Sequence, residues 1–147
     1  MFRSIVVGTD GSDTARQAVR EAIALAAALS ASIELVSAYE PVAGQRLREE
    51  SREAPRDLQW MINARDDVEA TLREAEAEVA AAGVAVRTYA REGDAADAIL
   101  DVAEERGADL IVVGNKGMTG AKRFLLGSVP NKVSHHAPCS VLIIRTS

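Results

Sequence analysis

Short apolar runs alternate with longer amphipathic stretches along the chain. Five runs have the length and composition of β-strands, and they cover residues 5–7, 33–38, 84–91, 109–113 and 139–145. The first and fourth runs are short and almost entirely apolar, which is typical of strands that are buried on both faces of a parallel sheet. In residues 84–91, apolar and polar positions alternate, and we expect Val84, Val86, Thr88 and Ala90 to share one face.

Between these runs, apolar residues recur at steps of three and four, the spacing of a helix that packs on a sheet. Helices are predicted after Ser12, over residues 57–82, after Asp94 and from Ser128. Ser12 and Asp94 are suitable N-caps, and Gly83 is a suitable C-terminal stop. The apolar stripe of the helix over residues 57–82 comprises Met61, Ala64, Val68, Thr71, Ala75, Val79 and Ala82. The polar residues 39–56 are interpreted either as a flap over the strand ends or as a solvated charged surface.

Strands that alternate with helices in this way predict an open, doubly wound α/β fold, a five-stranded parallel sheet with helices on both faces. The 147 residues suit a single domain, residues 1–147. We predict the strand order 3-2-1-4-5. In such sheets, ligands bind beyond the carboxyl ends of the strands, where the strand order reverses. The loops that follow the first and fourth strands, at Asp10 and Gly114, are then expected to be neighbours.

The composition and net charge of the chain limit the classes of molecule that it is expected to bind. The net charge of −5 gives the protein no general attraction to DNA, RNA or anionic lipid, so neither a nucleic acid nor a membrane is expected as a partner. The longest apolar run, residues 22–29, is too short to span a bilayer, and the N-terminal run is too short for a signal peptide. We therefore expect a cytoplasmic protein. The single cysteine, Cys139, excludes an intrachain disulfide and is expected to be a small buried hydrophobe.

Residues 114–128 form a glycine-rich connection between an apolar strand and a helix. Glycines lack the Cβ that would keep a ligand away from the backbone, and the helix that begins near Ser128 adds unpaired amides and a partial positive charge. The segment therefore suits a phosphate, although a connection that only turns the chain stays an alternative. Neither a P-loop nor a dinucleotide-binding fingerprint is present.

Gly114 and Gly117 are separated by two residues, and nine further residues precede Gly127-Ser128. This spacing resembles the nucleotide-binding signature of the universal stress protein family. Residues 5–12, Ile-Val-Val-Gly-Thr-Asp-Gly-Ser, resemble the opening strand and turn of that family, and residues 141–144 resemble its closing strand. The resemblance covers essentially the whole chain. It implies an adenine nucleotide as ligand, namely ATP, AMP or cyclic AMP, and the segments around Ala38 and Ser128 resemble members that favour cyclic AMP.

The resemblance also implies which residues contact the nucleotide. Adenine is expected at the backbone of Ala38, at the end of the second strand. The full set of implied site residues is Gly8, Thr9, Asp10, Ala38, Val113, Gly114, Asn115, Gly117, Gly127, Ser128 and Val129. Asp10 would repel phosphates unless it holds a ribose hydroxyl or faces a Mg²⁺ ion that the phosphates share. The other interpretation of Asp10 is a carboxylate that only forms the turn.

The leading hypothesis is a cytoplasmic adenine-nucleotide-binding stress-response protein that senses or sequesters its ligand. A second is a slow Mg²⁺-dependent ATPase or phosphotransfer protein in which Asp10 and the metal align the γ-phosphate. A third is a protein-partner-binding module that nucleotide stabilises. No catalytic motif is evident, and the adjacent His135 and His136 are a poor metal pair. The family resemblance also implies a homodimer formed through the last strand.

Overall fold

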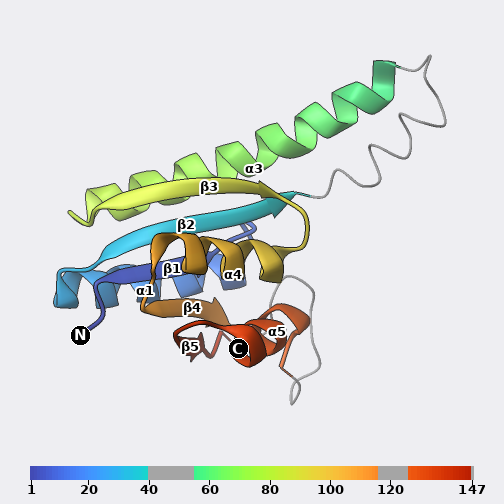
Figure 1. Ribbon diagram of the computed structural model, residues 1–147. Helices are drawn as coiled ribbons and strands as arrows, with labels where there is room; N and C mark the ends of the chain where they lie inside the picture. Colours follow the sequence, from blue (N-terminus) through green and yellow to red (C-terminus); the bar gives the residue numbers. More distant parts are fainter. Residues whose placement is uncertain (40–54, 116–125, 147) are drawn as a thin grey trace.

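A computed structural model of the chain describes residues 1–39, 55–115 and 126–146, and of residues 55–64 it describes the backbone alone. Strands and helices alternate along these segments (Figure 1). In chain order the elements are β1 (Ser4–Gly8), α1 (Asp13–Leu29), β2 (Ser32–Tyr39), α3 (Pro55–Ala81), β3 (Val86–Glu92), α4 (Ala95–Arg106), β4 (Leu110–Gly114), α5 (Ser128–His136) and β5 (Ser140–Ile144).

The five strands form one sheet in the order β3-β2-β1-β4-β5, and every neighbouring pair is parallel. In the centre of the sheet, Val7 of β1 lies opposite Leu35 of β2 on one side and Val112 of β4 on the other. The predicted fold class and strand order are confirmed. Because the order reverses between β1 and β4, the carboxyl ends of these two strands lie side by side.

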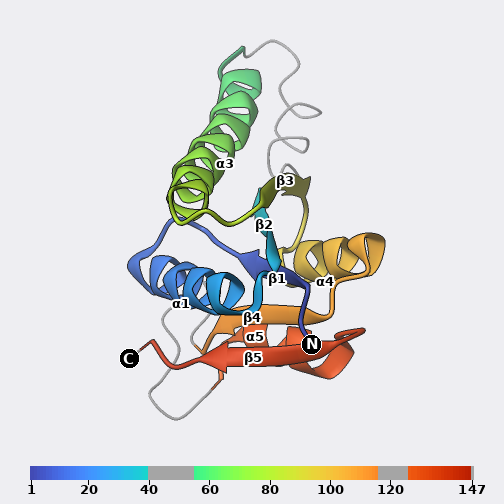
Figure 2. The same ribbon diagram turned by 90° about the vertical axis from the view of Figure 1, so that its left-hand side faces the viewer.

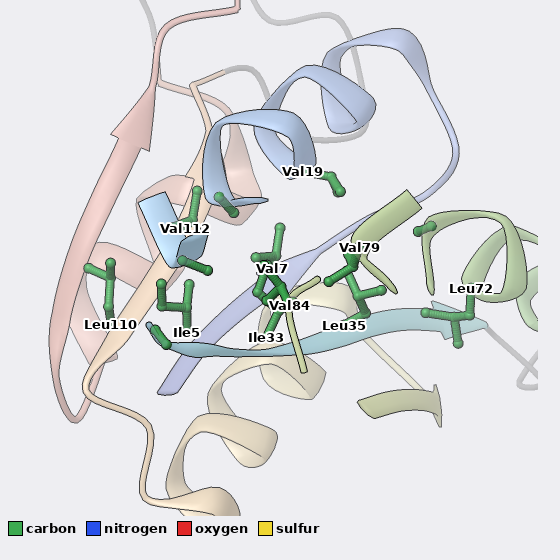
Figure 3. Packing of buried hydrophobic residues seen from close by; sticks show 14 residues of the cluster. Ile5, Val7, Val19, Ile33, Leu35, Leu72, Val79, Val84, Leu110 and Val112 are labelled. Atoms are coloured by element: carbon green, nitrogen blue, oxygen red, sulfur yellow. The ribbon is translucent and has the colours of Figure 1, made fainter. Parts of the chain in front are cut away.

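Helices cover both faces of the sheet, with α1 and α3 on one face and α4 on the other (Figure 2). Alternate side chains of each central strand enter opposite cores, so Val7 packs with α1 and α3 whereas Val6 packs with α4 and α5. Figure 3 shows the first of these cores, in which Val19 of α1 and Val79 of α3 pack over the strand side chains. Full burial of each such side chain contributes about 1.5–3 kcal/mol to stability.

The predicted N-caps of two helices are confirmed. The Ser12 hydroxyl accepts a hydrogen bond of 3.3 Å from the Ala15 amide at the start of α1, and the Asp94 carboxylate accepts one of 3.1 Å from the Asp97 amide at the start of α4. Gly83, the predicted stop, has a positive φ of 76° just after α3, a conformation that favours glycine.

The helix predicted over residues 57–82 starts earlier in the structure. α3 begins at Pro55 rather than at residue 57, since proline is well tolerated in a first helical turn. Residues 40–54, most of the predicted flap, lie outside the described residues, as do the side chains of Met61 and Ala64. None of the helices in the described part of the chain is long and apolar enough to cross a membrane.

Burial also departs from the predicted pattern at four positions. Ala82 is exposed because α3 ends before it, whereas Leu72, which the predicted stripe omits, is buried. In β3, Thr88 is exposed and Tyr89 is partly buried, because this edge strand has neither face fully covered. Cys139 is partly buried just before β5, and this burial raises the pKa of its thiol.

Candidate functional site

A small cavity lies at the carboxyl ends of β1 and β4, where the strand order reverses. Its volume of about 30 Å³ has room for little more than a water molecule, so the described residues do not by themselves enclose a space of nucleotide size. The lining residues come from both strand ends and from α1, α4 and α5, and they are Gly8, Asp10, Thr14, Ala15, Ile99, Val113, Gly114, Val129 and Pro130.

The turn after β1 holds Asp10 beside this cavity. Thr9 is buried, its amide donates to the Val36 carbonyl at 2.9 Å, and its hydroxyl accepts from the Gly11 amide at 3.2 Å. The Asp10 carboxylate accepts a hydrogen bond of 2.9 Å from the Ser12 amide. One carboxylate oxygen therefore forms the turn, as the second interpretation of Asp10 requires, while the side chain still lines the cavity.

Close packing restricts the residue at the end of β1. A Cβ atom on Gly8 would lie 2.5 Å from the Cδ1 atom of Ile99, which is nearer than carbon atoms approach in proteins. Ile99 is buried on α4 and lines the cavity together with Val113. The side of the cavity next to the sheet is therefore apolar, which suits a base or a ribose ring better than a phosphate.

The N-terminus of α5 supplies polar donors, and Val129 and Pro130 of its first turn line the cavity. Gly127 is the N-cap and offers no side chain, and the first turn contains no acidic residue. Pro130 has no backbone N–H, so the amides of Ser128 and Val129 are the donors at this helix end. A negative charge placed there would be stabilised both by these amides and by the helix dipole.

Asn115, directly after β4, is tied to three neighbours. Its amide donates to the Ile144 carbonyl at 2.9 Å, and its carbonyl accepts from the Gly127 amide at 3.0 Å. Its side-chain oxygen accepts from both the amide and the hydroxyl of Thr146, at 2.9 and 3.0 Å. The Gly127 amide therefore already has a partner within the protein, so the next two amides, of Ser128 and Val129, are the ones that could face an anion.

The structure gathers some of the predicted site residues and leaves others apart. Of the predicted set, the cavity lining includes Gly8, Asp10, Val113, Gly114 and Val129. Thr9 is buried beneath the turn, and Ala38 packs into the core under α4 at the end of β2. Gly117 lies outside the described residues.

Four lining residues were not among those predicted: Thr14, Ala15, Ile99 and Pro130. Thr14 and Ala15 occupy the first turn of the helix after Asp10, so a helical projection from the Ser12 N-cap could have found them. Ile99 gives no local signal, because only the packing of α4 on the sheet brings it to the cavity.

Asp10 is the single ionisable side chain in the described lining of the cavity. Within the described residues, no group of three or more His, Cys, Asp or Glu side chains is placed to hold a metal ion. One carboxylate cannot enclose Mg²⁺, which prefers six oxygen ligands, but it fits an ion that phosphates and water mainly hold. The residues present therefore suit a metal that arrives with a nucleotide.

Known proteins resemble this chain along nearly its whole length. Residues 1–145 match the sequence profile of the Universal stress protein family. Universal stress protein Rv1636 of Mycobacterium tuberculosis is 36% identical over 149 residues, which cover 99% of this chain and 98% of that protein. YxiE of Bacillus subtilis, also a universal stress protein, is 33% identical over 150 residues, which cover 99% and 100% of the two chains.

Solved structures show the same similarity in three dimensions. A universal stress protein in complex with cyclic AMP has a TM-score of 0.72 and 36% identity, over 99% of this chain and 98% of that one. UspA of Lactobacillus plantarum has a TM-score of 0.83 and 26% identity, over 98% of each chain. From its sequence and its fold, the chain belongs to the universal stress protein family.

Proposed function

We propose that this protein binds an adenine nucleotide, ATP, AMP or cyclic AMP, and acts in a stress response as a sensor or as a store of its ligand. The observation that carries this proposal is the N-terminus of α5, which has no side-chain cap and lies beside a cavity at the ends of β1 and β4. The apolar side of the cavity suits the nucleoside, and the amides of Ser128 and Val129 suit its phosphates.

The similarity to a universal stress protein in complex with cyclic AMP supports this choice of ligand class. In the proposal, Asp10 either accepts a hydrogen bond from a ribose hydroxyl or faces a nucleotide-bound Mg²⁺ ion. These roles predict different responses to metal, because only the second makes affinity depend on Mg²⁺. Since adenine nucleotides are made and used inside cells, we place the function in the cytoplasm.

Isothermal titration with ATP, AMP and cyclic AMP, each with and without Mg²⁺, tests the proposal. Micromolar affinity, about −8 kcal/mol, is within reach of several amide–phosphate contacts and a partly buried base. The variant Ala15→Leu places a larger side chain in the cavity while keeping the helix and its cap. We expect it to weaken binding at least about tenfold, which is 1.4 kcal/mol.

Ala24→Leu is the matched control, because Ala24 is an exposed residue of the same helix α1. This variant should bind nucleotide like the wild type. Wild-type protein that binds none of the three nucleotides would overturn the proposal. Equal weakening by the two variants would instead place the ligand away from this cavity.

We also propose a homodimer formed through β5. In the part of the chain that the structure describes, β5 pairs with β4 alone, so its outer edge lies open. Leu142 and Ile143 on this strand are 40% and 38% exposed. An apolar strand with an open edge is a template for pairing with another chain, and a second copy would cover it.

A further inference from the structure

Asn115 connects three segments that are far apart in the sequence. Its backbone extends the β4–β5 ladder to Ile144 and receives the Gly127 amide, while its side chain receives the amide and the hydroxyl of Thr146. These bonds are 2.9–3.0 Å long. One residue therefore joins the end of the sheet, the N-cap of α5 and the segment that follows β5.

Each of these partners belongs to a different part of the proposed function. Ile144 is the last residue of β5, the strand whose outer edge would pair with a second copy. Gly127 is the N-cap of α5, whose first amides would receive phosphate. Thr146 packs against Gly114 in the cavity lining, since its Cγ2 atom lies 3.4 Å from the position of a Cβ on that glycine.

The side chain of Asn115 is held in one orientation by these contacts. A carboxamide oxygen has two lone pairs, and here each accepts a hydrogen bond from Thr146. Rotation of the side chain would break both bonds together. The position of the segment after β5 is thereby linked to that of Asn115, and through the Gly127 amide to the first turn of α5.

We propose that Asn115 is a positioning residue that couples the pairing of β5 with a second copy to nucleotide binding at α5. The inference rests on the proposed nucleotide site and on the proposed dimer. Pairing further stabilises β5 and the Thr146 segment, which holds Asn115 and thereby keeps the α5 amides aligned with the cavity. Because such coupling is reciprocal, bound nucleotide strengthens the dimer by the same factor.

The coupling is measured as the ratio of the dimer dissociation constants without nucleotide and at saturating nucleotide. Sedimentation velocity over a dilution series gives both constants, with whichever of Mg²⁺-ATP and cyclic AMP binds the wild type more tightly. For wild-type protein we expect a ratio of about ten, within the usual range of allosteric coupling. Saturation of each variant removes differences in nucleotide affinity from the comparison.

Three variants isolate the role of the side chain. Asn115→Ala removes both bonds to Thr146 and should bring the ratio close to one. Thr146→Val removes only the hydroxyl bond and keeps the amide bond, so its ratio should lie between that of Asn115→Ala and that of the wild type. Asn131→Ala makes the same change at an exposed position of α5 and should keep the wild-type ratio. Thermal unfolding of each variant separates lost coupling from a general loss of stability.

A wild-type ratio of one, in a protein that binds nucleotide and dimerises, would overturn the inference while the proposed function stands. A wild-type ratio in Asn115→Ala would also overturn the inference. If Asn115→Ala does not fold, a wild-type ratio in Thr146→Val would overturn it in the same way. An absence of nucleotide binding in the titration of the wild type would instead overturn the proposed function, and this inference with it.

Discussion

Glu34 is a carboxylate buried in the middle of β2, with a side chain only 6% exposed. Its Oε2 atom accepts a hydrogen bond of 2.9 Å from the Tyr89 hydroxyl, and its Oε1 atom lies 3.9 Å from the Nε atom of Arg106. A buried charge is costly unless it is paired and hydrogen-bonded. The nearer partner is Tyr89, so the cost of burying Glu34 is offset mainly through that hydroxyl.

We therefore expect Tyr89→Phe to lower the free energy of unfolding by about 1.5–3 kcal/mol at neutral pH, the usual worth of a hydrogen bond to a charged group. Urea denaturation measures this change. Tyr39→Phe is the matched control, because no described residue accepts a hydrogen bond from that hydroxyl and the ring stays under Arg65. An equal loss of stability in the two variants would contradict this role for Glu34.

The same pair predicts a dependence on alkaline pH. Burial, and after it the hydrogen bond to Glu34, raises the pKa of Tyr89 from 10.0 to about 12. The folded protein thus keeps this proton where the unfolded chain loses it, so the stabilisation is complete below pH 10 and is lost as the pH rises to about 12. The stability gap between wild type and Tyr89→Phe should close over this range, and a constant gap would count against the assignment.

At the residue scale, side-chain contacts between distant segments are harder to predict from the sequence than local contacts. The Ser12 cap and the Asp10 turn join residues that are two or three positions apart, and local chemistry suggests both. Glu34 is recognisable in the sequence only as a polar residue in an apolar strand. Nothing local points to Tyr89 as its partner, because the pairing of β2 with β3 brings the two residues together.

At the scale of elements, α4 begins with a cap that also contacts another helix. The Asp94 carboxylate accepts a hydrogen bond from the Asp97 amide and lies 3.3 Å from the Lys132 ammonium group on α5. The bond from the Asp97 amide, and after it the contact with Lys132, lowers the pKa of Asp94. The carboxylate therefore both caps the start of α4 and helps to hold α5 against it.

Asp94→Ala should lower the free energy of unfolding by about 1 kcal/mol, because it removes the N-cap. Asp94→Asn keeps a cap of nearly equal quality and loses only the charge that faces Lys132, so it should cost much less. Chemical denaturation at pH 7 compares the two variants. If asparagine proved as costly as alanine, the contact with Lys132 and not the cap would account for the stabilisation.

Element types and caps were predictable because each depends on a few neighbouring residues. Which side chains are buried was harder to predict. In α3, Leu72 is buried although the predicted stripe omits it, and in β3 Thr88 and Tyr89 exchange the expected exposure. Spacing defines which residues share a face, but the neighbouring elements decide which face is covered. An edge strand such as β3, with both faces partly covered, carries the weakest signal.

At the scale of the whole molecule, the two edges of the sheet differ in chemistry. The edge strand β3 carries Arg87, Arg91 and Glu92, and charged side chains on an edge discourage pairing with another chain. The opposite edge strand, β5, has the sequence Ser-Val-Leu-Ile-Ile and presents Leu142 and Ile143 to solvent. Of the two edges, only that of β5 lacks this protection, which supports our proposal that β5 forms the dimer.

A single added charge on each edge tests this proposal. Leu142→Lys would place an ammonium group in the proposed interface, where two copies related by symmetry bring like charges together and desolvate them. We expect a dimer dissociation constant at least about 100-fold higher, or 2.7 kcal/mol, in sedimentation velocity experiments.

Thr88→Lys makes a comparable change at an exposed position of β3, on the opposite edge, and should leave the dimer intact. A dimer that survives Leu142→Lys, or that is weakened equally by both variants, would show that β5 is not the interface. Since the inferred role of Asn115 requires β5 to pair, that result would also remove the structural route from the dimer to the nucleotide site.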